Sequence, residues 1–308
     1  MNGNGTVFVK GYVCRDISDK GAARMKPKKG NNWTAYYDPD TKRYFAEIIY
    51  TSREGREQYD YEITQTIYDR LVITMACTGK CKHCSESDHN GFTGHIDADA
   101  AAEAIEKICA HYRIKTVMTF GGEPLLYPDV VCKIHKTASD LGIEKRQLIT
   151  NGYFSNNPER IEAVAKDLKN SGVNDLLLSV DAFHQEYIPL EPVFHFAKSA
   201  VQAGIPVRLQ PAWLVSPEDQ NPYNARTREI IREFDPLHIS LNQGNVIFPS
   251  GNALKYLREY FDEKAPVSNP YEEDPKDVRT ISFDPDGGVL NGNIYQTGIL
   301  EIIEKYKP

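Results

Sequence analysis

The stretch "RLVITMACTGKCKHC" (residues 70–84) decides how the rest of the chain is interpreted. Its first seven residues are apolar enough for a buried strand, and three of the six cysteines follow within the next eight residues. These cysteines, spaced C-x3-C-x2-C, are Cys77, Cys81 and Cys84. Three thiolates on one short loop can converge on a single metal centre.

Two kinds of metal centre fit this loop. A structural zinc site normally has four ligands, and His83 or His89 could supply the fourth. A cubane iron–sulfur cluster is usually held by four thiolates, so three thiolates leave one iron open for another ligand. Buried free thiols are a third possibility, and the spacing alone leaves all three open.

The composition places this chain among globular proteins. Of its 308 residues, 41% are hydrophobic, which is enough for a sizeable core and too many for disorder. The net charge of −7 argues against a nucleic-acid partner. The N-terminus lacks the pattern of a signal peptide, and no apolar run approaches the roughly 20 residues that span a bilayer. We therefore expect a cytoplasmic protein without a membrane partner, in which clustered cysteines serve metal or redox chemistry.

Strands and helices are expected to alternate about six times from residue 69 onward. The expected strands are 70–76, 115–120, 146–150, 175–180, 206–214 and 237–242. The expected helices between them are 97–112, 127–142, 157–172, 191–204 and 224–234. The strands are apolar without a period of two, which indicates an α/β fold whose parallel sheet is covered on both faces. The sheet could be a barrel, a partial barrel or doubly wound, and in each case ligands bind at the carboxyl ends of the strands.

The two flanks of this core have a different character. Residues 1–68 form a β-rich extension in which 31–50, "NNWTAYYDPDTKRYFAEIIY", predicts a hairpin. One edge of the hairpin could pair with an extended peptide, but we favour a role in covering an open side of the barrel. Residues 246–308 form a small C-terminal cap, with a helix at 252–262, a strand pair around 284–288 and a last helix at 297–306.

Polar and small residues stand at the ends of four consecutive strands. "TFGGEP" (119–124) holds two glycines whose missing Cβ atoms allow close approach to a ligand, and a glutamate that can accept a hydrogen bond from an ammonium group. The polar residues at each of these strand ends could instead form an ordinary turn or helix cap. The candidate residues are Gly121, Gly122, Glu123, Asn151, Ser179, Asp181, His184 and Gln210.

"CTGKCKHC" after the first strand and "TFGGEP" after the second resemble the radical S-adenosylmethionine (SAM) enzymes over about residues 69–245. The resemblance implies a TIM-like, partial parallel (β/α)6 barrel. It also implies that Cys77, Cys81 and Cys84 bind a [4Fe-4S] cluster whose open iron chelates SAM. The reduced cluster would cleave SAM to a 5′-deoxyadenosyl radical that abstracts hydrogen from a substrate. A reductant protein such as flavodoxin or ferredoxin would supply the electron.

The resemblance also implies roles for the strand-end residues. Gly121, Gly122 and Glu123 would orient the amino group of SAM. Asn151, Ser179, Asp181, Gln210 and His83, which stands where an aromatic residue is common, would complete the cofactor pocket. His184 would carry a proton or contact substrate, although a helix-start contact explains it equally well. Trp213 could line the pocket or pack in the core, and Arg208 could bind a substrate carboxylate.

The C-terminal residues 284–306 resemble the tail of the SPASM or twitch extension that carries auxiliary clusters in peptide-modifying relatives. No cysteine follows Cys132, and packing explains Cys109 and Cys132 better than ligation does. We therefore expect a single cluster, with Cys14 as the one cysteine in the N-terminal extension. The expected substrate is a peptide or protein side chain, with a small metabolite or a nucleoside as alternatives. A non-catalytic zinc- or cluster-binding module is the alternative of another class.

Overall fold

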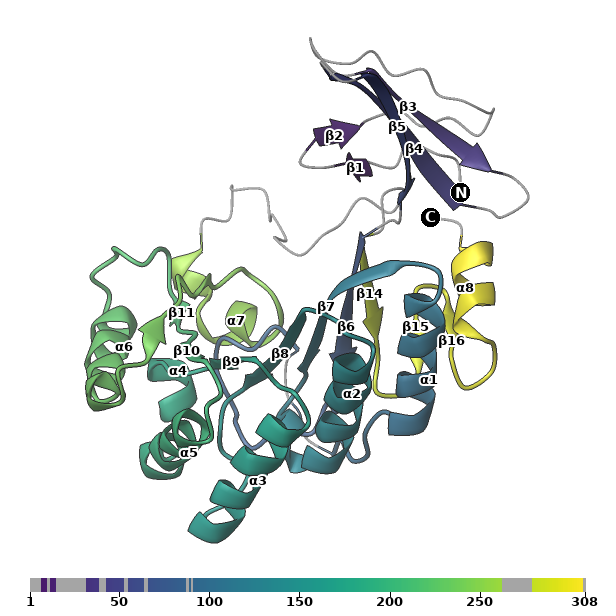
Figure 1. The fold of residues 1–308 in the computed structure, drawn as a ribbon. Helices are drawn as coiled ribbons and strands as arrows, with labels where there is room; N and C mark the ends of the chain where they lie inside the picture. Colours follow the sequence, from purple (N-terminus) through teal and green to yellow (C-terminus); the bar gives the residue numbers. More distant parts are fainter. Residues whose placement is uncertain are drawn as a thin grey trace.

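The computed structural model describes residues 68–86, 89, 91–261 and 279–306 in full, and only the backbone of strands before residue 68. Within this part of the chain the protein is an α/β structure built around one large, curved and mostly parallel sheet (Figure 1). The order of its strands is β12-β10-β9-β8-β7-β6-β14-β15-β16.

Six of these strands form the parallel series that the sequence predicts. Neighbours in the series pair in parallel, each strand lying beside the next one along the chain. The strands are β6 (Thr66–Val72), β7 (Arg113–Phe120), β8 (Lys145–Thr150), β9 (Asp175–Leu178), β10 (Val207–Leu209) and β12 (Ser240–Leu241). The expected partial (β/α) barrel is therefore confirmed. The two-residue strands β11 (Ala212–Trp213) and β13 (Asn245–Val246) form a separate parallel pair.

A layer of helices covers the outer face of the sheet (Figure 1). Its members are α1 (Ala98–Cys109), α2 (Pro128–Asp140), α3 (Pro158–Asn170) and α5 (Leu190–Gln202), with α6 (Pro222–Arg232) further along the chain. Local sequence explains where these helices begin. Asp97 and Asn157 cap α1 and α3 by accepting hydrogen bonds from the backbone N–H groups of the first turn, and proline occupies a first-turn position in α2, α3 and α6.

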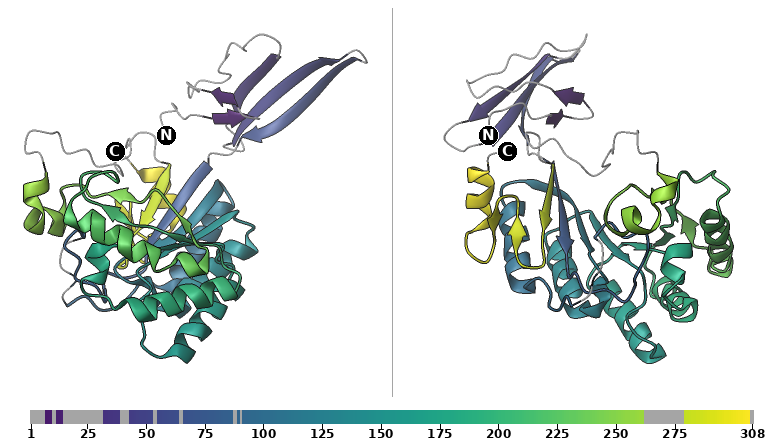
Figure 2. Two further views of the ribbon diagram at one scale, coloured as in Figure 1. Left: turned by 90° about the vertical axis from the view of Figure 1, so that its left-hand side faces the viewer. Right: turned by 180° about the vertical axis from the view of Figure 1, so that it is seen from behind.

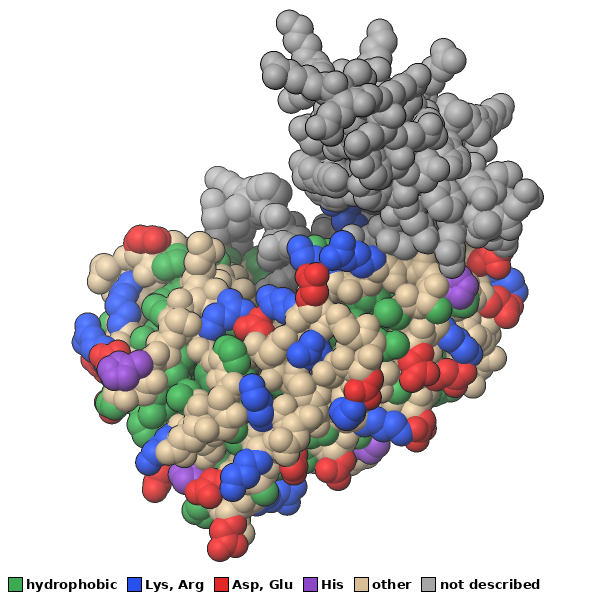
Figure 3. Space-filling view, in the orientation of Figure 1, with side chains coloured by type: hydrophobic (Ala, Val, Ile, Leu, Met, Phe, Trp, Pro, Cys, Tyr) green, Lys and Arg blue, Asp and Glu red, His purple; other side chains and the backbone are tan. Residues whose placement is uncertain are grey.

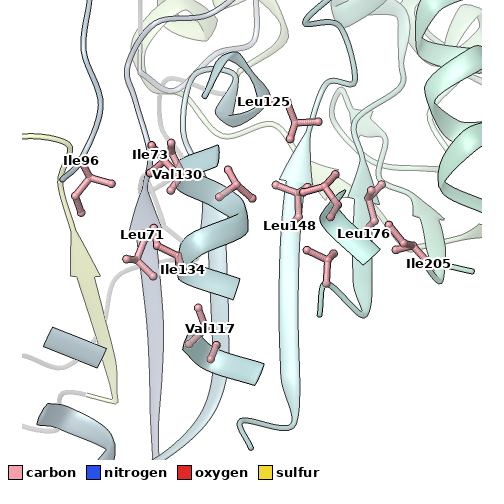
Figure 4. Packing of buried hydrophobic residues seen from close by; sticks show 14 of the residues in the cluster. Leu71, Ile73, Ile96, Val117, Leu125, Val130, Ile134, Leu148, Leu176 and Ile205 are labelled. Atoms are coloured by element: carbon pink, nitrogen blue, oxygen red, sulfur yellow. The ribbon is translucent and has the colours of Figure 1, made fainter. Parts of the chain in front are cut away.

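The main core lies between the sheet and these helices. Figure 4 shows Leu71, Val117 and Leu148 of three adjacent strands near Val130 and Ile134 of α2. All five side chains are buried. Burying a side chain of this size stabilises the fold by roughly 1.5–3 kcal/mol, so this layer fixes the strand ends that carry the site.

The C-terminal segment extends the barrel sheet. The strand β14 (Thr280–Phe283) pairs in parallel with β6, and then β15 (Gly288–Val289) and β16 (Gly292–Asn293) continue the sheet in antiparallel fashion. The predicted strand pair around 284–288 is confirmed, whereas its attachment to β6 was not expected. The last helix, α8 (Ile299–Lys305), packs against α1, and the right-hand view of Figure 2 shows the two helices side by side.

Shorter elements complete the described chain. They are α4 (Ala182–Gln185), α7 (Gly251–Tyr256) and the 3₁₀ helices η1 (Pro124–Leu126), η2 (Asp235–Leu237) and η3 (Arg258–Tyr260). In the N-terminal extension, β1 (Val7–Val9) pairs with β2 (Tyr12–Cys14), and β4 (Arg43–Ser52) pairs antiparallel with β3 (Asn32–Asp38) and β5 (Gly55–Ile63). The predicted hairpin is thus the β3–β4 pair. Its proposed role depends on side chains outside the described residues.

The surface carries charges of both signs. On the face shown in Figure 3, acidic and basic side chains are interspersed over the described residues. None of the helices described is long and apolar enough to cross a bilayer.

Candidate cluster and cofactor site

A cavity of about 390 Å³ lies at the carboxyl ends of the barrel strands. The cysteine loop that follows β6 forms one wall, and residues that follow β7, β8, β9, β10, β12 and β14 form much of the rest. Parallel strands bring their carboxyl ends to one edge of the sheet, so motifs far apart in the sequence meet here. The cavity therefore gathers the three cysteines and most of the strand-end residues that the sequence singled out.

The cysteine loop places its thiols around a glycine. A Cβ atom on Gly79 would lie 3.1 Å from the Sγ of Cys81 and 3.7 Å from the Sγ of Cys77. The N–H of Gly79 also donates to the Sγ of Cys77 over 3.3 Å. Cys81 is buried, Cys77 and Cys84 are half-buried, and all three line the cavity. Because Gly79 has no side chain, the sulfurs of Cys77 and Cys81 have room to lie close to its backbone.

Two of the thiols, those of Cys77 and Cys81, resist deprotonation when no metal is bound. Burial raises the pKa of Cys77 to about 12, and burial followed by the nearby Asp181 carboxylate raises the pKa of Cys81 well above its usual value. Positively charged iron or zinc would offset this cost by binding the deprotonated sulfurs. Three thiols on one loop, facing a cavity with space beyond them, fit a [4Fe-4S] cluster with one iron directed away from the protein ligands.

Three imidazoles surround the thiols. The Sγ of Cys84 lies 3.2 Å from Nε2 of His89, whose Nδ1 lies 2.7 Å from the carbonyl oxygen of Met75. His83 packs against His184, with ring centroids 4.8 Å apart, and their ligand atoms lie within 4.8 Å of each other and of Cys81. A mixed cysteine–histidine zinc site therefore has suitable donors as well.

His83 is neutral in this environment. Burial, which outweighs the attraction of the nearby Asp181, lowers its pKa to about 4. Its ring also packs against Phe183 with a centroid separation of 5.0 Å. Its Nδ1 atom is buried and has no hydrogen-bond partner among the described residues. A bound cofactor could supply that partner, which agrees with the predicted place of His83 in the cofactor pocket.

The two glycines of "TFGGEP" allow β7 to approach the chain that leads into the cysteine loop. A Cβ atom would lie 2.5 Å from the carbonyl oxygen of Thr74 at Gly121, and 2.2 Å from that of Ala76 at Gly122. Gly121 also has a φ of +141°, which favours glycine. The N–H groups of Gly122 and Glu123 donate to the same two carbonyl oxygens over 2.7 and 2.8 Å. Both glycines line the cavity, and the backbone they approach belongs to the cluster wall.

Glu123 connects the ends of β7 and β8. It is fully buried, and one carboxylate oxygen accepts from the Thr150 hydroxyl over 2.6 Å and from the Leu125 N–H over 2.9 Å. The other oxygen accepts from the Asn151 N–H over 2.8 Å. Burial raises the pKa of Glu123 to about 7. These bonds explain why the residue is a glutamate, and its contact with the SAM ammonium group stays a prediction.

Three of the side chains predicted for the cofactor pocket line the cavity. Asn151, Ser179 and Gln210 follow β8, β9 and β10, and all three line the cavity. The Nδ2 of Asn151 lies 3.2 Å from the Thr78 hydroxyl, and this contact links the cysteine loop to β8. Neutral groups of this kind can bond to ribose hydroxyls or to a carboxylate without adding charge.

The buried Asp181 and the half-buried His184 form a pair at the start of α4. One Asp181 oxygen caps the helix by accepting from the N–H groups of Phe183 and His184, each over 2.9 Å. The other accepts from the Ala212 N–H over 3.0 Å and lies 2.8 Å from His184 Nδ1. Burial alone would raise the pKa of Asp181, but His184 outweighs it and holds the pKa well below the usual range. Both residues line the cavity. Asp181 can therefore cap the helix and contribute to the wall of the cavity at the same time.

Two side predictions are resolved by their contacts. The Arg208 guanidinium donates to both carboxylate oxygens of Asp175, each over 2.6 Å, so the suggestion that it binds a substrate carboxylate is wrong. Trp213 is only 5% exposed and donates to the carbonyl oxygen of Gln243 over 2.8 Å, which confirms its packing role. Cys109 and Cys132 pack against the main core as expected. The side chain of Cys14 lies outside the described residues.

The sequence did not point to the segment after β12, although it forms part of the cavity wall. The residues concerned are Asn245, Val246, Ile247 and Phe248. No recognisable motif marks them, and they follow the last strand that the alternation predicts. Their place in the wall depends on the pairing of β11 with β13, which only the structure shows.

A parallel partial barrel with a three-cysteine loop at its carboxyl edge defines an α/β domain with a candidate metal site among its strand ends. Residues 71–210 match the family model described as the radical SAM superfamily. This match covers less than half of the chain, so it is the barrel segment that resembles the radical SAM superfamily.

Several known proteins are similar to this chain. The GTP 3′,8-cyclase of Moorella thermoacetica is 29% identical over 155 residues, which cover 47% of this chain and 46% of the cyclase. The GTP 3′,8-cyclase of Lactiplantibacillus plantarum is 33% identical over 119 residues, covering 38% of this chain and 34% of the cyclase. The chain thus spans less than half the length of these curated relatives.

Solved structures show the same fold at low identity. Streptococcus suis SuiB bound to S-adenosylmethionine aligns with a TM-score of 0.52 and 14% identity, over 78% of this chain and 66% of that one. A structure of anSMEcpe with bound AdoMet aligns with a TM-score of 0.53 and 14% identity, over 78% of this chain and 80% of that one.

Proposed function

We propose that this protein is a radical SAM enzyme that cleaves SAM reductively and abstracts a hydrogen atom from a substrate. The observation that carries the proposal is the convergence of three cysteines from one loop on the cavity at the carboxyl ends of the barrel strands. When bound there, a reduced [4Fe-4S] cluster supplies the electron that breaks a carbon–sulfur bond of SAM, giving methionine and a 5′-deoxyadenosyl radical. That radical takes a hydrogen atom from the substrate and becomes 5′-deoxyadenosine.

The chain's own residues hold and orient the reactants. Cys77, Cys81 and Cys84 are the ligands of one cluster, since the other two cysteines whose side chains are described pack against the core. Asn151, Ser179 and Gln210 offer neutral hydrogen-bonding groups to SAM. Apolar side chains of the cavity wall exclude water from the radical step. The protein therefore contributes binding, orientation and exclusion of solvent, and the cofactors contribute the chemistry.

The charge of the cavity supports a peptide or protein side chain as the substrate. Among the described residues that line it, none is a lysine or an arginine, whereas Glu86, Asp181 and Asp284 are acidic. A nucleoside triphosphate carries several negative charges and needs cationic partners, which this part of the wall does not offer. A neutral or cationic group, such as a peptide side chain or an uncharged metabolite, suits the wall better.

A purine nucleotide is the second candidate substrate. The curated relatives named above are GTP 3′,8-cyclases, and this likeness is the observation that favours it. The two candidates differ in charge, so they differ in the salt dependence of binding as well as in the product.

The remaining elements of the proposal concern the surroundings of the enzyme. An electron must enter from outside the chain, and we propose a small reductant protein of the flavodoxin or ferredoxin type as its source. An iron that stays open to SAM is sensitive to oxygen, so we propose a reducing compartment, the cytoplasm, as the place of action.

The proposal is tested by the formation of 5′-deoxyadenosine. The protein is purified anaerobically, reconstituted with iron and sulfide, reduced with dithionite and incubated with SAM. We expect 5′-deoxyadenosine from the wild type and from Cys109→Ala/Cys132→Ala, and none from Cys77→Ala/Cys81→Ala/Cys84→Ala. A wild type that forms no product and holds stoichiometric zinc would identify a binding module instead. Addition of a peptide library or of GTP then shows which substrate class raises the rate.

A further inference from the structure

The helix α7 begins directly against the cysteine loop, although more than 160 residues of sequence separate the two. The carbonyl oxygens of Cys81, Cys84 and Ser85 all face residues 250–252 at the start of this helix. Neither the cysteine spacing nor the strand-end motifs point to this contact. Through this contact, a segment that follows the parallel strands packs against the loop that carries the three cysteines.

Asn252 makes the central contact. Its backbone N–H donates to the carbonyl oxygen of Cys84 over 2.9 Å, and its side-chain Nδ2 donates to that of Cys81 over 3.3 Å. The residue is only 3% exposed, so these bonds form away from water. Without the amide, the Cys81 carbonyl oxygen keeps only its bond from the Cys84 N–H, over 3.2 Å. The loop then loses its side-chain hydrogen bond from Asn252, which favours other loop conformations.

Gly251 allows the approach. A Cβ atom at this position would lie 2.3 Å from the carbonyl oxygen of Ser85 and 2.6 Å from that of Cys84. Its φ of +51° also lies in the left-handed region that favours glycine. Ser250 adds a longer contact, 3.4 Å from its hydroxyl to the carbonyl oxygen of Ser85. The sequence Ser-Gly-Asn therefore combines a glycine that lets the two backbones approach with two polar side chains that donate to the cysteine loop.

We propose that Asn252 is a positioning residue for the metal centre, and that residues 250–252 clamp the cysteine loop. The inference rests on the proposed function. The loop itself contributes the hydrogen bond from the Cys84 N–H to the Cys81 carbonyl oxygen, over 3.2 Å, and Asn252 joins these same two residues from outside. Because Cys81 and Cys84 are both cluster ligands, the clamp fixes the separation of their sulfurs and slows release of iron.

The matched control is Asn224. This asparagine is also fully buried, and its Nδ2 donates to the carbonyl oxygens of Leu214 and Ser216 over 3.0 and 2.8 Å. It therefore holds a loop in the same manner, but it holds a loop without cluster ligands. Asn224→Ala should also destabilise the fold, because its amide accepts from the Leu214 N–H and donates to the Asp219 carbonyl oxygen as well. Only Asn252→Ala should affect the metal.

The experiment measures iron release to a chelator, together with the reduction potential of the reconstituted cluster. We expect Asn252→Ala to release iron about 10- to 100-fold faster than the wild type, with a shifted potential, while Asn224→Ala matches the wild type in both. Gly251→Ala, which keeps the asparagine, should also speed release, and it serves if Asn252→Ala fails to fold. Equal release and equal potentials in all folded variants would overturn the proposal. If the wild type holds zinc instead of iron, the proposed function fails, and zinc release from the same variants still tests the clamp.

Discussion

At the scale of single residues, Gly122 has less space around its Cα atom than the motif itself indicates. A Cβ atom there would meet the carbonyl oxygen of Ala76 at 2.2 Å, and this backbone leads directly into Cys77. Backbone atoms cannot move aside as the end of a flexible side chain can, so a substitution must displace the cysteine loop.

The first prediction concerns this glycine. Gly122→Ala should lower the iron bound per chain after reconstitution to well under half of the wild-type value, because the first cysteine moves. Gly298→Ala is the control, since a Cβ atom at Gly298 meets nothing within 4 Å. Iron and sulfide analysis provides the measurement. Wild-type iron content in Gly122→Ala would show that the loop tolerates the displacement.

The second prediction concerns Asp69, a fully buried carboxylate on β6 whose oxygens have no hydrogen-bond partner among the described residues. Burial raises its pKa to about 8, so the native state binds more protons than the unfolded state between pH ~4 and ~8. Stability from this residue therefore falls as pH rises through that window. Asp69→Asn should stabilise the protein more at pH 8.5 than at pH 5.5, by about 1–3 kcal/mol.

Urea denaturation of both proteins at the two pH values checks this sign. The thiol of Cys109 on α1 interacts electrostatically with Asp69, so Cys109→Ala is a useful background in which to repeat the comparison. A gain that is equal at both pH values, or larger at pH 5.5, would show that Asp69 does not titrate as its burial implies.

Residue types predicted the site unevenly. The spacing of Cys77, Cys81 and Cys84 was sufficient to predict that the three thiols share one cavity, because neighbouring thiols on one short loop lie close together. The carboxylate of Glu123 was harder to assign, because an acid at a strand end can either face the cavity or accept from neighbouring backbone N–H groups. The structure shows that it accepts from Leu125 and Asn151. Such a choice depends on strand geometry that no local pattern contains.

At the scale of elements, β14 changes the view of the C-terminal segment. It pairs in parallel with β6, the strand that carries the cysteine loop, and its Phe283 is fully buried in the main core. The strand therefore supports the site from the side opposite to β7.

The third prediction tests this support. Phe283→Ala should lower the free energy of unfolding by about 3–5 kcal/mol, because it leaves a cavity beside β6. Phe92→Ala, at a side chain that is 49% exposed, should change it by less than about 0.5 kcal/mol. Denaturant titrations of the two variants give the comparison. Equal, small effects would mean that the C-terminal strand contributes little to the core.

Alternation of apolar and polar segments predicted the six parallel strands and the helices between them, because each has a local signature of length and capping. The pairing of β14 with β6 lies beyond such signatures, since it joins residues about 210 positions apart. The contact of α7 with the cysteine loop escaped notice for the same reason, because it depends on close backbone approach at Gly251.

At the scale of the whole molecule, the barrel edge, the cysteine loop and the start of α7 enclose one site. The sheet brings the strand ends together, the glycines let the loop come close, and the later segment holds the loop in place. A cluster bound by three thiols, with its fourth iron open to SAM, is the central claim of this account.

Electron paramagnetic resonance of the reduced, reconstituted protein tests that claim most directly. We predict a [4Fe-4S]⁺ signal that integrates to one cluster per chain, changes when SAM is added, and is absent from Cys81→Ala. A reconstituted wild type without this signal, or with a signal that SAM leaves unchanged, would contradict the account.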